Sequence, residues 1–266
     1  SGEPEGFAQA AVFAIEALGR LEDGGVMLDG LTLDIAGVAR SVEDYETVVT
    51  GIGGALPEGV QLVATAITPA AVDDYGWTGS RDGGEVTITG YVPSLDDRTQ
   101  VTALAEQLFE GATLSADIRV ASGGPKMDWL GGIKFAMGQL AQLRTGTVVL
   151  GDRTYAIKGE ATDSDAFVML SEALARKLPA SLELDTADVN APAVSPYTLA
   201  MERTSGGVEI VGFAPSSDER KAIVDYAREQ FGIGKVQADI GFASGAPDGL
   251  VDAAAGAMRA SARLAG

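Results

Sequence analysis

Carboxylates are the side chains of this sequence with the clearest capacity for chemistry, because the chain contains neither Cys nor His. Without these residues there is no thiol redox centre, no Cys-based zinc site and no Ser–His–Asp relay. Adjacent acids occur at Asp73-Asp74, at Asp96-Asp97 and at Asp163-x-Asp165. Such pairs could bind Ca²⁺ through oxygen ligands or divide general acid and base work between them.

These acidic pairs fit a structural role better than a catalytic one. None continues as an EF-hand loop with its later Gly and Glu. Acids at the start of a helix cap its free N–H groups and interact favourably with its dipole. We therefore expect helix caps and solvated faces here, no bound metal or cofactor, and no enzymatic activity.

Four glycines recur in equivalent settings, at Gly37, Gly90, Gly159 and Gly212. Each follows a short run in which apolar and polar residues alternate. A phosphate-binding loop would require a pattern such as Gly-x-x-x-x-Gly-Lys, which none of them matches. A glycine at the end of a strand permits a bulge or a close backbone contact, so we predict a structural motif.

The two tryptophans, Trp77 and Trp129, are candidates for a partner surface. Trp129 opens a segment with Ile133, Met137 and Leu140 at helical spacing, which favours core packing or contact with the preceding part of the chain. Trp77 lies in a predicted strand, which also suggests packing. Both roles stay open at this point.

Charge is distributed unevenly along the 266 residues, which carry a net charge of −19. Residues 1–126 hold 6 basic and 20 acidic side chains, whereas residues 127–248 hold 11 and 17. This acidity disfavours nucleic-acid partners, which require a basic surface. It also disfavours attachment to anionic lipid. No apolar run approaches the ~20 residues that span a bilayer, so we expect no transmembrane segment.

An internal repeat organises the chain. Gly-Tyr-Val-Pro-Ser at Gly90–Ser94 recurs as Gly-Phe-Ala-Pro-Ser at Gly212–Ser216, 122 positions later. The same offset relates Ala116–Ile118 to Ala238–Ile240. We predict a first copy over 1–126, a second over 127–248, and the start of a third over 249–266. The partial third copy and the start at Ser1 without Met lead us to expect a piece of a longer protein.

Each copy divides into two units, because Gly90 lies 53 residues after Gly37 and Gly212 lies 53 after Gly159. The predicted units are 7–70, 71–125, 127–190 and 191–247. Each reads strand, strand, helix, strand, with alternating strands such as Val86-x-Ile88 and capping signals such as Ser94-x-x-Asp97. A longer helix precedes each pair of units, over Phe7–Leu21, Leu130–Leu143 and Leu250–Leu264. The predicted fold class is α+β, with small mixed sheets covered by helices.

This pattern resembles tandem BON domains, small modules of bacterial envelope proteins. The resemblance rests on Val86-x-Ile88-x-Gly90-x-Val92-x-Ser94 and its repeat at Val208–Ser216, with weaker echoes at Leu33–Gly37 and Tyr155–Gly159. The paired copies also look like the periplasmic region that precedes a peptidoglycan-binding domain in some OmpA-family proteins of the outer membrane. The sequence departs from the family in lacking a long leading helix before the second unit of each copy.

The resemblance implies a location in the periplasm of a Gram-negative bacterium, and the different charges of the two copies lead us to expect protein binding. We expect a non-catalytic scaffold or interaction region, with other envelope proteins or repeats of the same chain as partners. Phospholipid binding is the alternative that the resemblance also implies. A carboxylate-dependent hydrolase of envelope polymers is a third reading.

Overall fold

A computed structural model describes residues 4–54, 56–204 and 206–263 of the chain. Within them lie seven α-helices and twelve strands, with one 3₁₀ turn at Ile233–Lys235. The helices are α1 (Phe7–Gly19), α2 (Val42–Gly54), α3 (Leu95–Leu108), α4 (Trp129–Leu140), α5 (Ser164–Arg176), α6 (Ser217–Phe231) and α7 (Leu250–Arg263). The strands are β1 (Leu21–Asp29), β2 (Thr32–Ala39), β3 (Gln61–Thr68), β4 (Gly76–Asp82), β5 (Glu85–Val92), β6 (Thr113–Val120), β7 (Leu143–Gly151), β8 (Thr154–Ala161), β9 (Glu183–Asn190), β10 (Leu199–Thr204), β11 (Gly207–Ala214) and β12 (Val236–Phe242).

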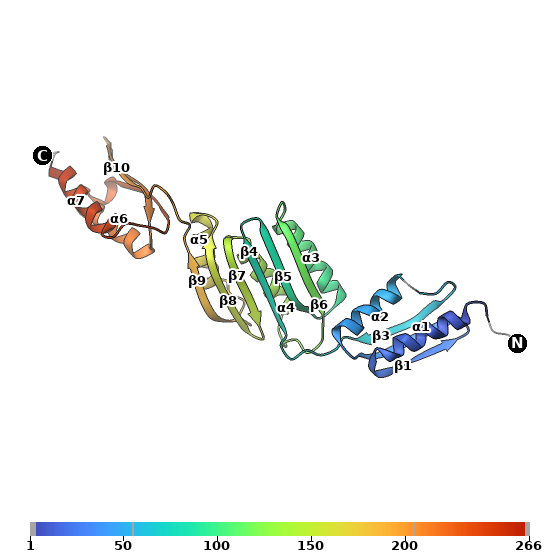
Figure 1. Cartoon of the computed structure of the whole chain (residues 1–266). Coiled ribbons are helices and arrows are strands. Elements are labelled where there is room, and N and C mark those ends of the chain that lie inside the picture. Colours follow the sequence, from blue (N-terminus) through green and yellow to red (C-terminus); the bar gives the residue numbers. More distant parts are fainter. Residues whose placement is uncertain (1–3, 55, 205, 264–266) are drawn as a thin grey trace.

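The strands form three sheets, which lie in three successive bodies with the two ends of the chain far apart (Figure 1). The N-terminal sheet has the order β1-β2-β3, and the C-terminal sheet has the order β10-β11-β12. The central sheet has six strands in the order β6-β5-β4-β7-β8-β9. The predicted α+β class with small mixed sheets is confirmed.

The same unit of two strands, a helix and a third strand occurs four times. In each unit the first two strands are antiparallel and the third lies parallel to the second, for example β4·β5 and β5·β6. The crossover between the parallel strands runs through a helix, as a parallel pair requires. The predicted order of elements is confirmed.

Helix caps explain where the crossover helices begin. The Ser94 hydroxyl accepts a hydrogen bond from the Asp97 N–H at 3.1 Å, and it donates to the Asp97 carboxylate at 2.7 Å. Ser41 and Ser216 form the same pair of bonds with Asp44 and Glu219, and Asp163 accepts from the Ala166 N–H. The acid therefore binds the serine hydroxyl as part of each predicted serine cap.

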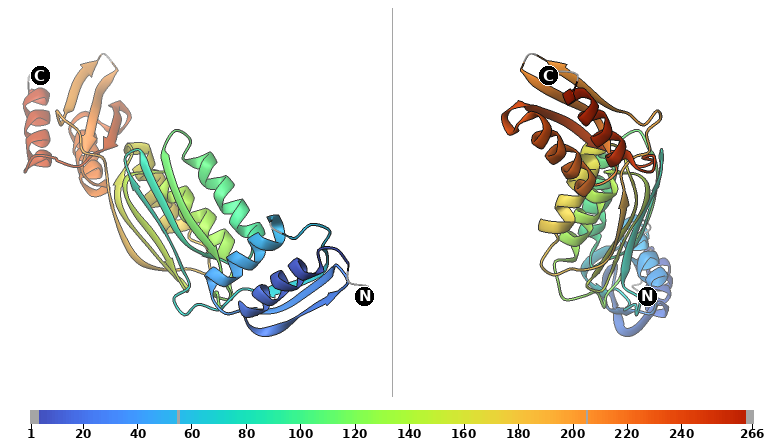
Figure 2. Two further views of the ribbon diagram at one scale, coloured as in Figure 1. Left: turned by 45° about the vertical axis from the view of Figure 1, so that its right-hand side comes forward. Right: turned by 90° about the vertical axis from the view of Figure 1, so that its left-hand side faces the viewer.

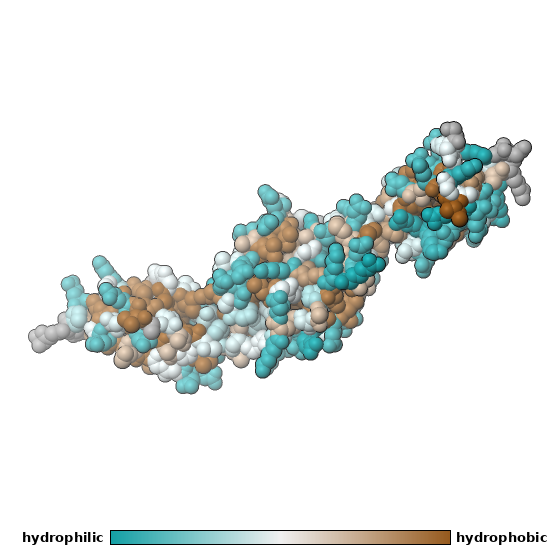
Figure 3. Space-filling model, turned by 180° about the vertical axis from the view of Figure 1, so that it is seen from behind, coloured by the Kyte–Doolittle hydropathy of each residue, from teal (hydrophilic) through white to brown (hydrophobic). Residues whose placement is uncertain are grey.

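Alternation along the second strand of each unit directs its apolar side chains into the core. Val86 and Ile88 on β5 are almost completely buried, as are Tyr155 and Ile157 on β8. Helices α3 and α4 lie on one face of the central sheet, as Figure 2 shows. Viewed from behind, hydrophobic and hydrophilic side chains are interspersed over all three bodies (Figure 3).

The leading helices are shorter than predicted. Leu21 and Leu143 were expected in the last turns of their helices, but they begin strands β1 and β7. Their apolar side chains satisfy the helical spacing and the strand's inward position equally well, which explains the error. The third helix covers Leu250–Arg263, and Leu264 lies outside the described residues.

The second and third units share one sheet. Strand β4 pairs with β7 in antiparallel register from Gly76↔Gly151 to Asp82↔Thr145. The sequence boundary at 126–127 therefore falls between strands of a single continuous sheet. Helix α4 packs over this junction, in contact with β7, β4 and α3.

The other two junctions between units place a helix against a strand. Helix α2 packs on β6, and α5 packs on β12, two contacts that the 122-residue period relates to each other. At the first, Arg119 pairs with Glu43 and Arg98 with Glu46, each with N···O of 2.7 Å. At the second, the ring of Phe242 lies 5.5 Å from that of Phe167. Along the chain the junctions therefore alternate: helix on strand, strand edge on strand edge, helix on strand.

Candidate interaction site

The motif glycines lie where a strand touches its antiparallel neighbour. Gly90 has φ of 139°, and a Cβ built on it would lie 2.4 Å from the Gly76 carbonyl oxygen. The other three show positive φ and an equally close backbone carbonyl. Only glycine tolerates both conditions, so the geometry gives the motif a backbone role. Gly90 also stands opposite Trp77 in the β4·β5 register.

Both tryptophans lie in the central core instead of on a surface. Trp77 is 1% exposed and Trp129 is 3% exposed. The Trp129 indole donates to the Tyr91 carbonyl at 2.9 Å, and its ring meets Tyr75 edge-on with centroids 5.4 Å apart. Neither indole is therefore available to an external partner. Trp129 instead joins α4 to the preceding unit, the packing role that its sequence position favoured.

The acidic pairs lie apart from one another, and no group of three Asp or Glu side chains in the described part of the chain could hold a metal ion. Asp96 and Asp97 begin α3, and Asp163 and Asp165 begin α5. Asp74 borders a shallow hollow of about 350 Å³ whose lining includes Asp117 and Arg119. Arg119 already binds Asp117 at 3.0 Å and Glu43 at 2.7 Å.

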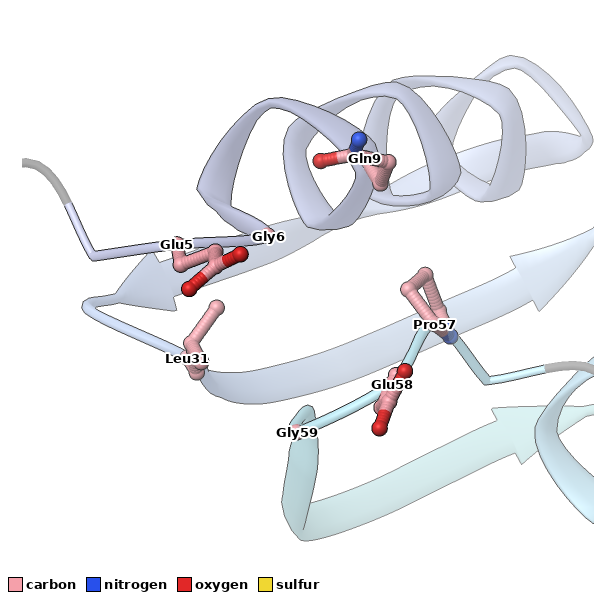
Figure 4. Close-up of a pocket in the computed structure, with 7 residues that line it drawn as sticks. All are labelled: Glu5, Gly6, Gln9, Leu31, Pro57, Glu58 and Gly59. Atoms are coloured by element: carbon pink, nitrogen blue, oxygen red, sulfur yellow. The ribbon is translucent and has the colours of Figure 1, made fainter.

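A larger hollow of about 600 Å³ lies in the N-terminal body (Figure 4). It is lined by Glu5, Gly6 and Gln9 near the start of α1, and by Leu31, Pro57, Glu58 and Gly59 from the loops facing them. Its two carboxylates were not singled out in the sequence, because they lie far apart along the chain and follow no motif.

The largest shifts in proton affinity occur at two buried phenols. Burial raises the pKa of Tyr75 and of Tyr155 well above the usual range, and no hydrogen-bond partner for either hydroxyl lies within the described residues. Among the carboxyls, the hydrogen bond from Arg144 lowers the pKa of Glu160. Glu160 thus remains charged at neutral pH, which does not suit a general acid.

The outer edges of β1 and β10 are open strand edges of the fold, as are those of β3, β6, β9 and β12. Strands β1 and β10 each have one neighbour in their sheet, β2 and β11 respectively. An unpaired strand edge presents free N–H and C=O groups to another chain. Helix α1 beside the β1 edge also exposes Ile15, Leu18 and Val12, with Ile15 68% exposed.

The open edges of β1 and β10 were not predicted from the sequence, although the 122-residue period relates these strands to the paired strands β7 and β4. Adding 122 to the numbers of β1 gives those of β7, and adding 122 to Gly76–Asp82 of β4 gives 198–204, which covers β10. Strands β4 and β7 are paired with each other, and β10 and β1 are their equivalents by the 122-residue period.

Comparison with known families identifies one BON domain, which matches residues 79–122. This span covers most of β4 together with β5, α3 and β6. The chain therefore contains a BON domain in its second unit. No curated protein matches the chain. Among the described residues, the helices are too short or too polar for any of them to traverse a bilayer.

Proposed function

We propose that this chain is a non-catalytic scaffold and interaction region of a periplasmic, OmpA-family-like protein of a Gram-negative envelope, with all four units BON-like. The observation that carries the proposal is the β4·β7 pairing, through which two units share one sheet. A unit that binds another by its strand edge is suited to assembly. The BON match at 79–122 supports the envelope setting.

The arrangement of the bodies supports a spacer role. The three sheets follow one another along the chain, and the described termini lie at opposite ends of the molecule (Figure 1). The buried residues found in the described structure are apolar. These buried apolar side chains pack within the units and at the contacts between units.

The test places a photo-activated cross-linking side chain at Met27 on β1 and, separately, at Glu85 on β5, in the chain exported to the periplasm of a Gram-negative host. A scaffold that binds through its open edges forms discrete protein adducts from Met27, whereas Glu85, on a strand paired on both sides, forms few. Absence of protein adducts from Met27 would contradict the proposal.

Phospholipid binding, the alternative, is tested with the purified chain and vesicles containing anionic lipid. Given a net charge of −19, electrostatic repulsion should prevent cosedimentation at low salt. Cosedimentation that weakens as salt increases would favour the lipid-binding alternative. The hydrolase hypothesis is tested by incubating the purified chain with peptidoglycan. Release of soluble fragments by the unmodified chain, but not by the Glu58→Gln variant, would favour a hydrolase.

A further inference from the structure

We propose that the β1 edge of one copy of this chain docks on the β10 edge of a second copy, in the antiparallel register that joins β4 to β7. The inference rests on the proposed interaction role and names its partner. It follows from the alternation of junctions. Within the described residues, the β1 and β10 edges each match one half of the β4·β7 junction, and the two halves are complementary.

The internal junction supplies the register. Trp77↔Leu150, Thr78↔Val149 and Gly79↔Val148 are paired across β4 and β7. Shifting β4 forward by 122 and β7 back by 122 gives Leu199↔Leu28, Ala200↔Met27 and Met201↔Val26. Each expected pair joins residues that the chain already tolerates in a strand.

The side chains that change between the two junctions compensate in volume. In the internal junction the Trp77 ring lies over Gly79, and Leu140 of α4 reaches the same spot. The corresponding pair on β10 is Leu199 and Met201, which replaces one very large and one absent side chain by two of middle size. Volume-conserving exchanges of this kind are well tolerated in a core.

A polar contact of the internal junction can also be reproduced. Arg81 on β4 donates to the Ala141 carbonyl at 2.9 Å, at the C-terminal end of α4. A cation there interacts favourably with the helix dipole. The equivalent groups are Arg203, exposed on β10, and the carbonyl of Gly19 at the end of α1. Docking would bring Arg203 of one copy to the end of α1 of the other.

The exposed stripe on α1 is explained by the same junction. Ile15 and Leu18 correspond to Met137 and Leu140 of α4. Those α4 residues are fully buried, whereas Ile15 is 68% and Leu18 is 43% exposed. The exposed apolar side chains of α1 therefore lie beside the β1 edge, in the position from which α4 covers the β4·β7 junction.

Helix α7 competes for this position, because it is also the equivalent of α4. It packs on α6 and faces β10, but a cavity of about 210 Å³ remains between them, lined in part by Leu199, Met201 and Ala257. Two large buried residues of α4, Met137 and Leu140, are replaced in α7 by the charged Arg259 and the small Ala262. Helix α7 is therefore a looser cover than α1 would be.

The test uses single cysteines in a chain that has none. Thr198 accepts from Phe213 on β11, so Ala200 on the same strand also directs its backbone groups toward β11. Ala200 and Met27 would then form a non-hydrogen-bonded pair, in which side chains lie close together. Oxidising a mixture of the Ala200→Cys and Met27→Cys variants of the 266-residue chain should give the mixed disulfide dimer in excess over both homodimers.

The matched control replaces Met27→Cys by Val63→Cys. Val63 lies on β3 at the other edge of the same sheet and is similarly exposed, 69% against 64% for Met27. It should give mixed dimer only at the level of random collision. Equal yields for Val63→Cys and Met27→Cys would overturn the proposal.

A second experiment measures association without a cross-link. Sedimentation velocity of the unmodified chain should show mass increasing with concentration, and more so at higher salt, because screening weakens the repulsion between two chains that each carry a net charge of −19. Met27→Asp with Ala200→Asp in one chain should abolish the increase, and Met27→Asp with Ala200→Lys should restore it. Met258→Asp, which releases α7, should strengthen association only when the edges are unchanged.

A monomer at every concentration, with no effect of these variants, would overturn self-docking. The proposed interaction role would survive that result if Met27 still gave adducts with other envelope proteins. Loss of those adducts as well would remove both proposals.

Discussion

At the scale of single residues, the motif glycines are governed by backbone contact. Their spacing was visible in the sequence, but the reason for glycine was not, because it depends on which carbonyl lies across the strand. For Gly90 that carbonyl belongs to Gly76, on the preceding strand. Neither a phosphate nor any other ligand is needed to explain the residue.

Replacing Gly90 by Ala should destabilise the central body by about 2–4 kcal/mol, since the new Cβ adds strain at positive φ and meets the Gly76 oxygen. Both tryptophans lie in this body, so denaturant unfolding followed by tryptophan fluorescence reports on it alone. Gly138→Ala on α4, where a Cβ meets open space, should instead stabilise it by about 0.5–1 kcal/mol. Equal effects of the two changes would contradict the backbone explanation.

The buried phenol of Tyr155 should make the central body sensitive to alkali. Its pKa is raised by burial from the ordinary 10.0, so above pH 10 the unfolded chain loses the proton first and folding stability falls as pH rises. Tyr155→Phe should reduce that alkaline loss. At neutral pH the substitution should change stability by less than about 1 kcal/mol, because the hydroxyl has no partner in the described structure. Denaturant midpoints at neutral and alkaline pH measure both effects.

At the scale of elements, periodicity and caps predicted most of the fold. The alternation of Val86 and Ile88 predicted β5, and Ser94 with Asp97 predicted the start of α3. The helix ends were less accurate, because Leu143 fits either a helix or a strand. The shared sheet was not predicted, since strand-edge pairing depends on exposed backbone groups, which every residue carries alike.

Arg81 provides a test of how α4 is held over the junction between β4 and β7. Arg81→Met keeps the apolar stem but removes the hydrogen bond to the end of α4, so it should cost the central body about 1.5–3 kcal/mol. Arg203→Met, at the equivalent position of β10, is the matched control and should leave the stability of the monomer unchanged. A comparable loss from Arg203→Met would show that α7 already uses this arginine.

At the scale of the whole molecule, the three junctions differ in the forces that hold them. The central one is a continuous backbone ladder under a helix. The C-terminal one includes the Phe167–Phe242 contact, a hydrogen bond from the Phe242 N–H to the Ser164 hydroxyl at 2.6 Å, and one from the Ala193 N–H to the Glu160 carboxylate at 3.2 Å. The N-terminal one includes two ion pairs whose side chains are partly exposed. Added salt should therefore weaken the N-terminal junction more than the other two junctions.

Raising the salt to about 1 M shortens the screening length to about 3 Å and should loosen the N-terminal junction first. Exposed ion pairs contribute only about 0.2–1 kcal/mol each, so the expected change is a broader distribution of orientations instead of unfolding. Spin labels on introduced cysteines can measure it, since the chain has no others. Distances between α2 and α3 should broaden with salt, whereas distances between α5 and α6 should not, because the apolar contact of Phe242 is unaffected by screening. Arg98→Gln with Arg119→Gln should reproduce the broadening at low salt, and an unchanged distribution in that variant would show that helix packing alone holds the junction.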